Sequence, residues 1–477
     1  MDLKPPMRRS AAALAVAQQP ATWTARCAAA LAIGIGFWFV GHSLAISRML
    51  DLAGALSADR VENHFAVQQS ETTTSSAVGY FVIGGMGLYC LLTAARDVNW
   101  RHPLLWLGAL YVTWCAASIL WSIEPIQSFR KLAILGLMLA GAFGAASRFD
   151  LEDVVWIVLL VLAGFVGIGV LAETALGTFR PWRSDYRFAG TCHPNDQGLQ
   201  CALLALVAGF AAFNDRDRPW LRRGLVVFGL AGLALSKSRT TLLALIVAAA
   251  IGLVLRSRGL QRWLILSVGV ALLCVGGIFS SFVSVAAIDQ SADIASLGRR
   301  ENISSLTGRL PLWHELWKAA DDRVLAGYGY GAFWGERNVL KYSRMLSWHI
   351  PHAHNAYLDS VLTVGVVGTA LYLTWVLATA GLATARYGQS GRRAELFVAC
   401  AVLFSLVHGV AESKLPGAGV AGFTLLAATA ALTLRPAGQP AAANAPFSAS
   451  PRSRRSSSPA LRRAVGGRFL NARRQPR

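Results

Sequence analysis

A histidine and an asparagine stand directly before a long apolar run in the stretch HAHNAYLDSVLTVGVVG, residues 352–368. An imidazole titrates near neutral pH, so His354 can take a proton from a hydroxyl group. Asn355 is a residue type that caps helices, and we expect it to cap a helix beginning at Ala356. His354 is therefore a candidate general base, with a purely structural histidine as the alternative.

Three arginines occupy positions that an anion would explain. Arg239, in LSKSRTTLLAL, lies between two apolar runs, where a guanidinium is costly without an anionic partner unless it snorkels to lipid phosphates. Arg309 follows LTG at the expected start of a helix, against the helix dipole, and the alternative is that it faces solvent. Arg187, in SDYRFAGTCHPNDQG, precedes a turn that contains His193 and Asn195. These two residues either only shape the turn or also take part in binding.

Glu412, in HGVAESKLPG, lies at the end of another apolar run, where it either orients a substrate or pairs with Lys414. His352 and His354 lack nearby cysteines or well-spaced carboxylates, so we predict no metal site and no cofactor. The seven cysteines also lack metal-ligand spacing. They mostly lie in apolar runs, and we interpret them as core residues without disulfides.

The elements that position these residues are membrane helices. Of the 477 residues 54% are hydrophobic and only 15% charged, and the mean hydropathy is +0.46, which indicates lipid as the main solvent. About twelve apolar runs approach the length that crosses a bilayer. They are 27–45, 76–95, 103–122, 131–147, 153–176, 197–214, 222–236, 240–256, 263–285, 356–384, 394–411 and 417–434. We therefore predict an all-α polytopic membrane protein with about 12 transmembrane helices.

Arginine-rich short loops fix the expected orientation. RDVNWRH, NDRDRPWLRR, RSRGLQR and ARYGQSGRR fall on one side with both termini, which we place in the cytoplasm. The loop after Met49, the segments containing Arg187, Arg239 and Glu412, and a long loop of about residues 286–351 face the periplasm or the exterior. In the long loop, TGRLPLWHELWKAADDRV predicts an amphipathic helix. Its apolar side is expected to comprise Leu310, Trp313, Leu316, Trp317 and Ala320.

These patterns divide the chain into five regions. They are a cytoplasmic N-terminus (1–26), nine transmembrane helices (27–285), a large periplasmic loop (286–353), three further transmembrane helices (354–434) and a basic tail (435–477). The N-terminus weakly resembles a signal peptide but lacks a compelling cleavage site, so we predict an uncleaved first helix. The tail has ten arginines and no acidic residue, and is expected to be disordered, near anionic lipid headgroups or simply solvated. The net charge of +20 is therefore no sign of nucleic-acid binding.

His354, Asn355, Gly365 and Gly368 form a pattern, HN followed by nine residues and GVVG, that resembles the signature of the O-antigen ligase and polymerase superfamily of bacterial envelope glycosyltransferases. About twelve spans, a late outer loop, and arginines at 239 and 309 agree with it. The phrases LTGRLPLW, GYGYGAFW and HAHNAYLDSVLTVGVVG look most like the exopolysaccharide-polymerase branch. The motifs cover about residues 180–415.

The resemblance implies a GT-C-like, metal-independent inverting glycosyltransferase of the bacterial inner membrane whose active site faces the periplasm. The implied donor is an undecaprenyl-diphosphate-linked oligosaccharide or polysaccharide, and the acceptor is another glycan or lipid A-core. His354 would be the general base, and Arg239 and Arg309 would bind the diphosphate. Arg187, Asn355 and Glu412 would support them. Other polysaccharide assembly proteins are possible partners.

Three alternatives remain open from the sequence. Polymerisation of repeat units and ligation of a finished glycan to lipid A-core share the donor chemistry, and the exopolysaccharide-like phrases favour the polymerase. A transporter or flippase for lipid-linked sugars predicts internal repeats and charged residues near the midplane, which the sequence does not clearly contain. A non-enzymatic scaffold of an export complex would leave Arg239, Arg309 and His354 freely replaceable.

Overall fold

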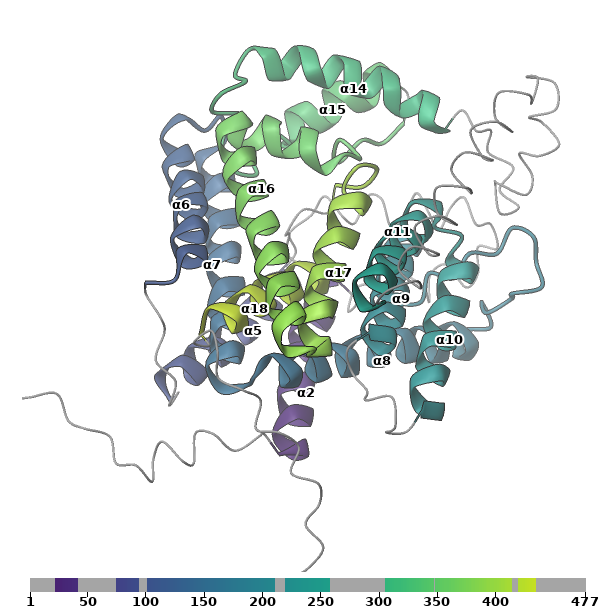
Figure 1. Ribbon diagram of the computed structural model, residues 1–477. Coiled ribbons are helices and arrows are strands. Elements are labelled where there is room, and N and C mark those ends of the chain that lie inside the picture. Colours follow the sequence, from purple (N-terminus) through teal and green to yellow (C-terminus); the bar gives the residue numbers. More distant parts are fainter. Residues whose placement is uncertain are drawn as a thin grey trace, which may run out of the picture. The chain divides into compact units, whose positions relative to one another are not determined.

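The computed structural model describes residues 22–41, 74–93, 101–210, 219–257, 305–346, 348–413 and 419–434. These residues contain helices and no strand, which confirms the all-α class (Figure 1). The helices are α2 (Trp23–Gly41), α5 (Thr74–Leu92), α6 (Pro103–Ala117), the 3-10 helix η1 (Ser118–Trp121), α7 (Pro125–Arg148), α8 (Leu151–Ala175), α9 (Pro194–Phe210), α10 (Pro219–Ser236), α11 (Arg239–Arg256), α14 (Ser305–Asp321), α15 (Glu336–Leu346), α16 (Ala356–Ser390), α17 (Arg393–His408) and α18 (Val420–Leu434).

Eleven of the twelve predicted apolar runs coincide with helices of the described residues, and the run 263–285 lies outside them. Seven helical segments are long and apolar enough to cross a membrane, namely α2, most of α5, α6 with η1, α7, α8, α11 and α16. The other four helices, α9, α10, α17 and α18, do not meet both criteria, and with 15 to 18 residues all four are shorter than the roughly 20 residues that a bilayer requires. The prediction of about twelve crossings is therefore not confirmed.

Small residues allow the membrane-type helices to pack closely. Helix α5 packs against α2 and α7, and α18 also packs against α7. Where α5 crosses α7, a Cβ atom added to Gly144 would lie 2.2 Å from the carbonyl oxygen of Gly87. Such contacts between backbones are typical of helix association in lipid, where apolar side chains gain little by leaving the solvent. The six cysteines of the described residues are free, as predicted, and Cys274 lies outside them.

Residues 305–353, without the undescribed position 347, form a cap whose apolar core is shared with the first turns of α16. The predicted amphipathic helix exists as α14, but its buried face differs from the expected one. Leu312, Leu316 and Ala320 are buried, whereas Leu310 and Trp317 are 55% and 50% exposed. The helix also starts at Ser305, so Arg309 lies in its second turn and not at its start. The argument from the helix dipole therefore does not hold for Arg309.

Helix α16 is broken at Gly365, where the backbone has φ 70° and ψ −178°. The segment 324–329 of the cap hydrogen-bonds to this break: the amides of Tyr328 and Gly329 donate to the carbonyls of Leu362 and Thr363. The amide of Val366 in turn donates to the carbonyl of Val324. A Cβ atom at position 365 would lie 2.1 Å from the carbonyl oxygen of Leu325, so this approach requires glycine. The break thus fixes the cap to the helix that begins directly after His354.

Candidate active site

The segments predicted to lie on one side of the membrane are in contact with one another. The guanidinium of Arg187 donates to the carbonyl of Ser236 (3.2 Å), and Arg309 donates to the carbonyl of Ala411 (2.6 Å). These contacts join the loop after α8, the α10–α11 turn, the cap and the segment after α17. The end of the helix bundle therefore carries a polar cluster. We call it the Glu412 cluster, and it comprises Arg187, Asn195, Arg309, His354 and Glu412.

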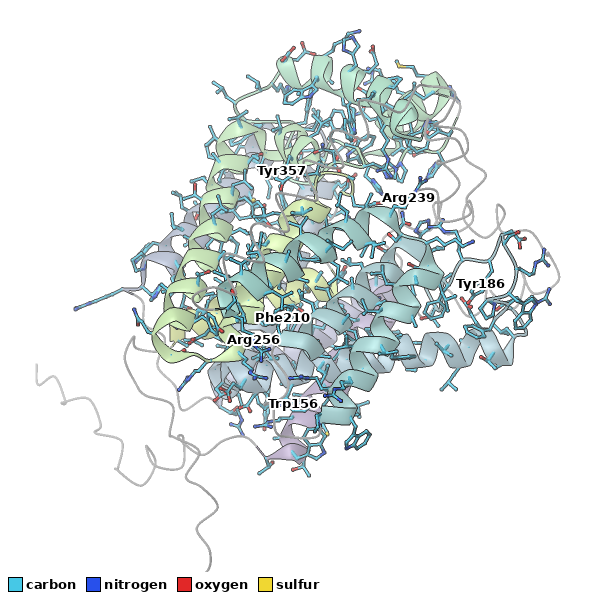
Figure 2. All side chains as sticks on the ribbon, turned by 45° about the vertical axis from the view of Figure 1, so that its right-hand side comes forward. Trp156, Tyr186, Phe210, Arg239, Arg256 and Tyr357 are labelled. Carbon is cyan, nitrogen blue, oxygen red and sulfur yellow. The ribbon has the colours of Figure 1, made fainter. Side chains whose placement is uncertain are left out.

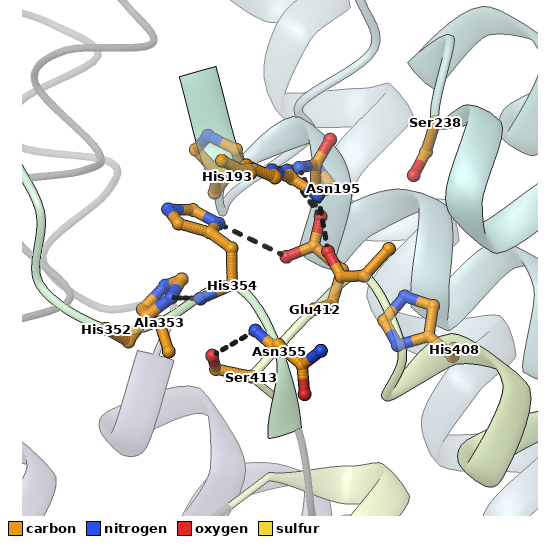
Figure 3. Close-up of polar contacts among 12 residues, drawn as sticks. His193, Asn195, Ser238, His352, Ala353, His354, Asn355, His408, Glu412 and Ser413 are labelled. Carbon is orange, nitrogen blue, oxygen red and sulfur yellow. Dashed lines mark hydrogen bonds and ion pairs between the residues drawn. The ribbon is translucent and has the colours of Figure 1, made fainter. Parts of the chain in front are cut away.

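Glu412 is the centre of this cluster and is only 5% exposed. Its Oε1 accepts a hydrogen bond from Nδ2 of Asn195 (3.1 Å) and lies 3.7 Å from Nη2 of Arg309. Its Oε2 lies 3.9 Å from Nδ1 of His354 (Figure 3). A buried carboxylate needs such partners, because desolvation alone strongly disfavours its charge.

The electrostatics of the cluster favour an ionised Glu412. Burial by itself would raise the pKa of this carboxyl group. The interaction with His354 and the positive charges of Arg309, His354 and His408 outweigh burial and hold the pKa of Glu412 well below its usual value. The cluster therefore contains a fixed negative charge beside the candidate base.

His354 is held in an unusual backbone conformation between aromatic rings. Its φ is 51°, in the left-handed region that a histidine seldom adopts. The backbone amide of His354 donates to Nδ1 of His352 (3.3 Å), and the centroids of the two imidazole rings are 4.1 Å apart. The ring centroid of Trp348 lies 5.5 Å from that of His354. Backbone strain of this kind persists where surrounding contacts over-determine it and is common at functional sites.

Asn355 caps α16 as expected. Its Oδ1 accepts hydrogen bonds from the amides of Tyr357 and Leu358, each 3.0 Å long. The amide of Asn355 itself donates to Oγ of Ser413 (3.2 Å), the residue next to Glu412. The cap therefore ties the start of α16 to the segment that carries Glu412. The alternative partner of Glu412, Lys414, lies outside the described residues.

Arg187 supports the cluster from a second layer, since Nη2 donates to Oδ1 of Asn195 (2.8 Å). Asn195 thus links Arg187 to Glu412. Its amide also donates to Nδ1 of His193 (3.2 Å), so these residues both shape the start of α9 and take part in the cluster. His193 and Asn195 therefore shape this turn, and their use in binding stays a prediction.

Arg239 is the first residue of α11 and is half-buried. Figure 2 shows it at the end of α11 nearer the cap. The adjacent Ser238 shares a hydrogen bond with Thr241 (2.8 Å), which in turn bonds to Nε2 of His408 (3.1 Å). His408 ends α17, four residues before Glu412. Arg239 therefore belongs to the same end of the bundle, although no direct contact joins it to His354 or Arg309 among the interactions described above.

Two further carboxylates near the site, the half-buried Asp359 and the buried Glu173, have no counterpart in the sequence-based prediction. Asp359 accepts hydrogen bonds from Trp334 (2.7 Å) and from the amide of Ala353 (3.0 Å), beside His354. Glu173 accepts hydrogen bonds from the amides of Ala189 and Gly190 and from the Tyr186 hydroxyl. An acidic residue inside an apolar run was the available signal for both. Within the described residues, no group of three or more His, Cys, Asp or Glu side chains is arranged to hold a metal ion.

Comparison with known proteins agrees with this geometry. Residues 224–373 match the family model described as O-antigen ligase, a range that includes Arg239, Arg309 and His354. The chain is also similar to the exopolysaccharide production protein ExoQ of Rhizobium meliloti (strain 1021). The two are 29% identical over 309 residues, which are 62% of this chain and 69% of ExoQ.

The described residues form a helical multi-pass membrane protein with a cluster of polar side chains at the ends of its helices. The matches narrow the class further: over these residues the chain resembles the O-antigen ligase family and a protein of exopolysaccharide production. This similarity supports an O-antigen ligase- or polymerase-type membrane enzyme.

Proposed function

We propose that this enzyme transfers an undecaprenyl-diphosphate-linked glycan to an acceptor hydroxyl on the periplasmic face of the inner membrane. The observation that carries the proposal is the contact of Glu412 with both Arg309 and His354. A candidate base and a candidate phosphate-binding guanidinium, distant in the sequence, share one buried carboxylate. The acceptor and the leaving group of a glycosyl transfer need groups of these two kinds side by side.

His354 acts as the general base of the proposed reaction. Its Nδ1 lies toward Glu412, so Nε2 is the nitrogen that takes the proton from the acceptor hydroxyl. The acceptor oxygen attacks the anomeric carbon with inversion, and the bond from this carbon to the lipid diphosphate breaks. Glu412 stabilises the imidazolium that forms, in the manner of the carboxylate partner of other catalytic histidines.

Arg309 and Arg239 neutralise the lipid diphosphate as it leaves, without a metal ion. A guanidinium has five N–H donors in a rigid fork that fits phosphate oxygens in pairs. Two nitrogens of Arg309 are used by Ala411 and Glu412, which leaves donors for a ligand, and the side chain is 22% exposed. The described polar groups also lie at helix ends, a placement that supports an enzyme at one face over a transporter with a site near the midplane.

We infer that the reaction extends a chain of repeat units, because the relative ExoQ is named for exopolysaccharide production. In a polymerase the acceptor is the next lipid-linked repeat, whereas in an O-antigen ligase it is lipid A-core. The Glu412 cluster serves the donor and the base in both reactions. The two functions therefore differ in their acceptors and are told apart by the intermediates that accumulate.

The test uses a strain that lacks this gene, complemented with wild type, His354→Ala or His314→Ala at matched membrane levels. His314 is an exposed histidine of α14 and is the control. Surface glycans and lipid-linked intermediates are resolved by size. For His354→Ala we expect single repeats to accumulate on lipid and long chains to disappear, with wild-type products for His314→Ala.

Other outcomes discriminate between the alternatives. Long lipid-linked chains together with uncapped lipid A-core would identify a ligase. Lipid-linked repeats retained on the cytoplasmic side would identify a transporter. Full glycan production by the His354→Ala protein would overturn the catalytic assignment.

A further inference from the structure

A polar cleft lies on the cap, apart from the Glu412 cluster, and is lined by residues of α14, α15 and the segment before α7. It has a volume of about 460 Å³, which is within the range of small-ligand sites. Three aromatic side chains line it, Tyr328, Phe333 and Tyr342, and Phe333 and Tyr342 are buried. The cleft thus has an aromatic wall inside an otherwise polar surface.

The charged residues of the cleft are balanced. Its lining contains three acidic and three basic side chains, namely Glu124, Glu315, Asp322, Lys318, Arg337 and Lys341. Some of them already have partners, because Lys318 pairs with Glu315 (2.7 Å) and Lys341 lies 4.9 Å from the ring centre of Tyr342.

Glu124, Asp322 and Arg337 keep their hydrogen-bonding capacity for a ligand. Within the described part of the chain, none of their side chains forms a hydrogen bond or an ion pair. Asn338 donates from Nδ2 to the carbonyl of Phe333 (2.7 Å), which leaves its Oδ1 as an acceptor. Hydrogen-bond donors and acceptors are therefore both available beside the aromatic side chains of the cleft.

We propose that this cleft binds a stretch of glycan at a distance from the Glu412 cluster. A sugar ring presents hydroxyl groups around its edge and C–H groups on its faces, so it matches alternating carboxylate, amide and guanidinium groups with aromatic rings behind them. A polyphosphate would meet three carboxylates, and an acyl chain would leave the charged groups desolvated. The proposal rests on the proposed function, since it supposes that glycan is the material handled at the active site.

A chain of contacts through the cap core connects the cleft to His354. Trp334 packs on Phe333 of the cleft wall, with ring centroids 5.2 Å apart. The indole of Trp334 donates to Asp359, which accepts the amide of Ala353, the neighbour of His354. A glycan strand held in the cleft would therefore be anchored on the same small unit that carries the base. Such a second contact raises the effective concentration of the acceptor or product chain and favours repeated transfer.

The experiment compares the full-length protein in nanodiscs with two cleft variants, Asp322→Ala and Arg337→Ala. The matched controls are Asp321→Ala and Arg344→Ala, exposed residues of the same helices outside the cleft. The probe is a size-fractionated mixture of oligosaccharides from partial hydrolysis of the surface polysaccharide of the complemented strain. Binding is measured with wild type, the four variants and His354→Ala, and the chain length of the surface glycan is measured in cells.

We expect each cleft variant to weaken oligosaccharide binding about tenfold, because a hydrogen bond to a charged group is lost. The surface glycan should become shorter, while the controls behave as wild type and His354→Ala binds the oligosaccharides normally. Unchanged binding and unchanged chain length in the Asp322→Ala, Arg337→Ala double variant would overturn the proposal for the cleft. Full glycan synthesis by His354→Ala would instead overturn the proposed function, and the binding data would still decide whether the cleft holds glycan.

Discussion

Nδ1 of His354 lies 3.9 Å from Oε2 of Glu412, and the backbone of His354 adopts a left-handed φ of 51°. The distance is that of an ion pair and is longer than a hydrogen bond. Both residues lie close to helix ends: His354 lies two residues before α16, and Glu412 lies four residues after α17. The packing of α16 on α17 therefore sets the geometry of the candidate catalytic pair.

Replacement of Glu412 by glutamine should reduce stability in a pH-dependent manner. The pKa of Glu412 is lower in the folded protein than its usual value of about 4.3, so its stabilising effect is present above that pH and is lost as the pH falls through the folded pKa. At pH 7 we expect Glu412→Gln to cost about 3 kcal/mol, as for other broken buried charge pairs. The difference should shrink below about pH 4. Thermal unfolding in detergent over a pH series measures it.

The control for that series is Glu315→Gln. The pKa of Glu315 is also lowered, by its hydrogen bond to Lys318, but this pair is on the surface of α14. Solvent screening makes such a surface pair contribute little to stability. If the difference in stability between wild type and Glu412→Gln stayed constant from pH 3 to pH 8, this would contradict the ionised state of Glu412.

Arg309→Lys should impair transfer almost as much as Arg309→Ala. We expect a loss of about 10²–10³ in rate, as for other groups that stabilise charge on a leaving atom. A lysine keeps the charge but cannot grip two phosphate oxygens with one planar group, nor reach both Ala411 and Glu412 in the same way. The measurement is polymer formation by membranes supplied with lipid-linked repeats. Arg344→Lys is the control, and wild-type rates for Arg309→Lys would exclude the bidentate role.

Gly365→Ala should prevent correct assembly of the cap. The methyl group would lie 2.1 Å from the carbonyl oxygen of Leu325, and φ 70° is itself unfavourable for alanine. Gly381, in the same helix, has open space at its Cβ position, so Gly381→Ala should be neutral or slightly stabilising. Size-exclusion chromatography and membrane abundance report the outcome. Equal behaviour of the two variants would show that the break in α16 is dispensable.

Tyr186→Phe should loosen the loop that carries Arg187. The Tyr186 hydroxyl donates to the buried Glu173 carboxylate (2.5 Å), which also holds the amides of Ala189 and Gly190. Loss of one such hydrogen bond costs about 1–3 kcal/mol. We expect a lower melting temperature and a raised KM for the lipid-linked donor with little change in kcat. Tyr89→Phe, at a position 66% exposed, is the control, and an unaltered melting temperature would argue against this anchoring role.

The apolar pattern predicted most of the architecture because lipid-facing helices need long runs of apolar residues. It placed eleven helices, and the residue type of Asn355 predicted the N-cap of α16. It overcounted the confirmed crossings, since short helices such as α17 and α18 are apolar without being long enough alone. It also misplaced one edge of the α14 face, since Leu310 and Trp317 are exposed and Leu312 is buried instead.

The candidate site was predicted residue by residue but not as an arrangement. Spacing singled out His354, Arg309 and Glu412, yet nothing local indicates that Glu412 lies between the other two. That contact depends on how α14, α16 and the end of α17 pack. Asp359 and Glu173 were missed because their partners are backbone amides and distant rings, which leave no periodic signal in the sequence. The roles proposed for these residues remain predictions.

The junction between the cap and α16 includes a strip of main-chain contacts. Tyr328, Gly329 and Val366 donate main-chain hydrogen bonds across it, and close contact requires glycine at positions 365 and 327. Side chains of the cap that lie away from the shared apolar cluster and from Asp359 take no part in this register. Such positions can change in sequence, and with them the surface of the cap, while the alignment of the cap on α16 is kept.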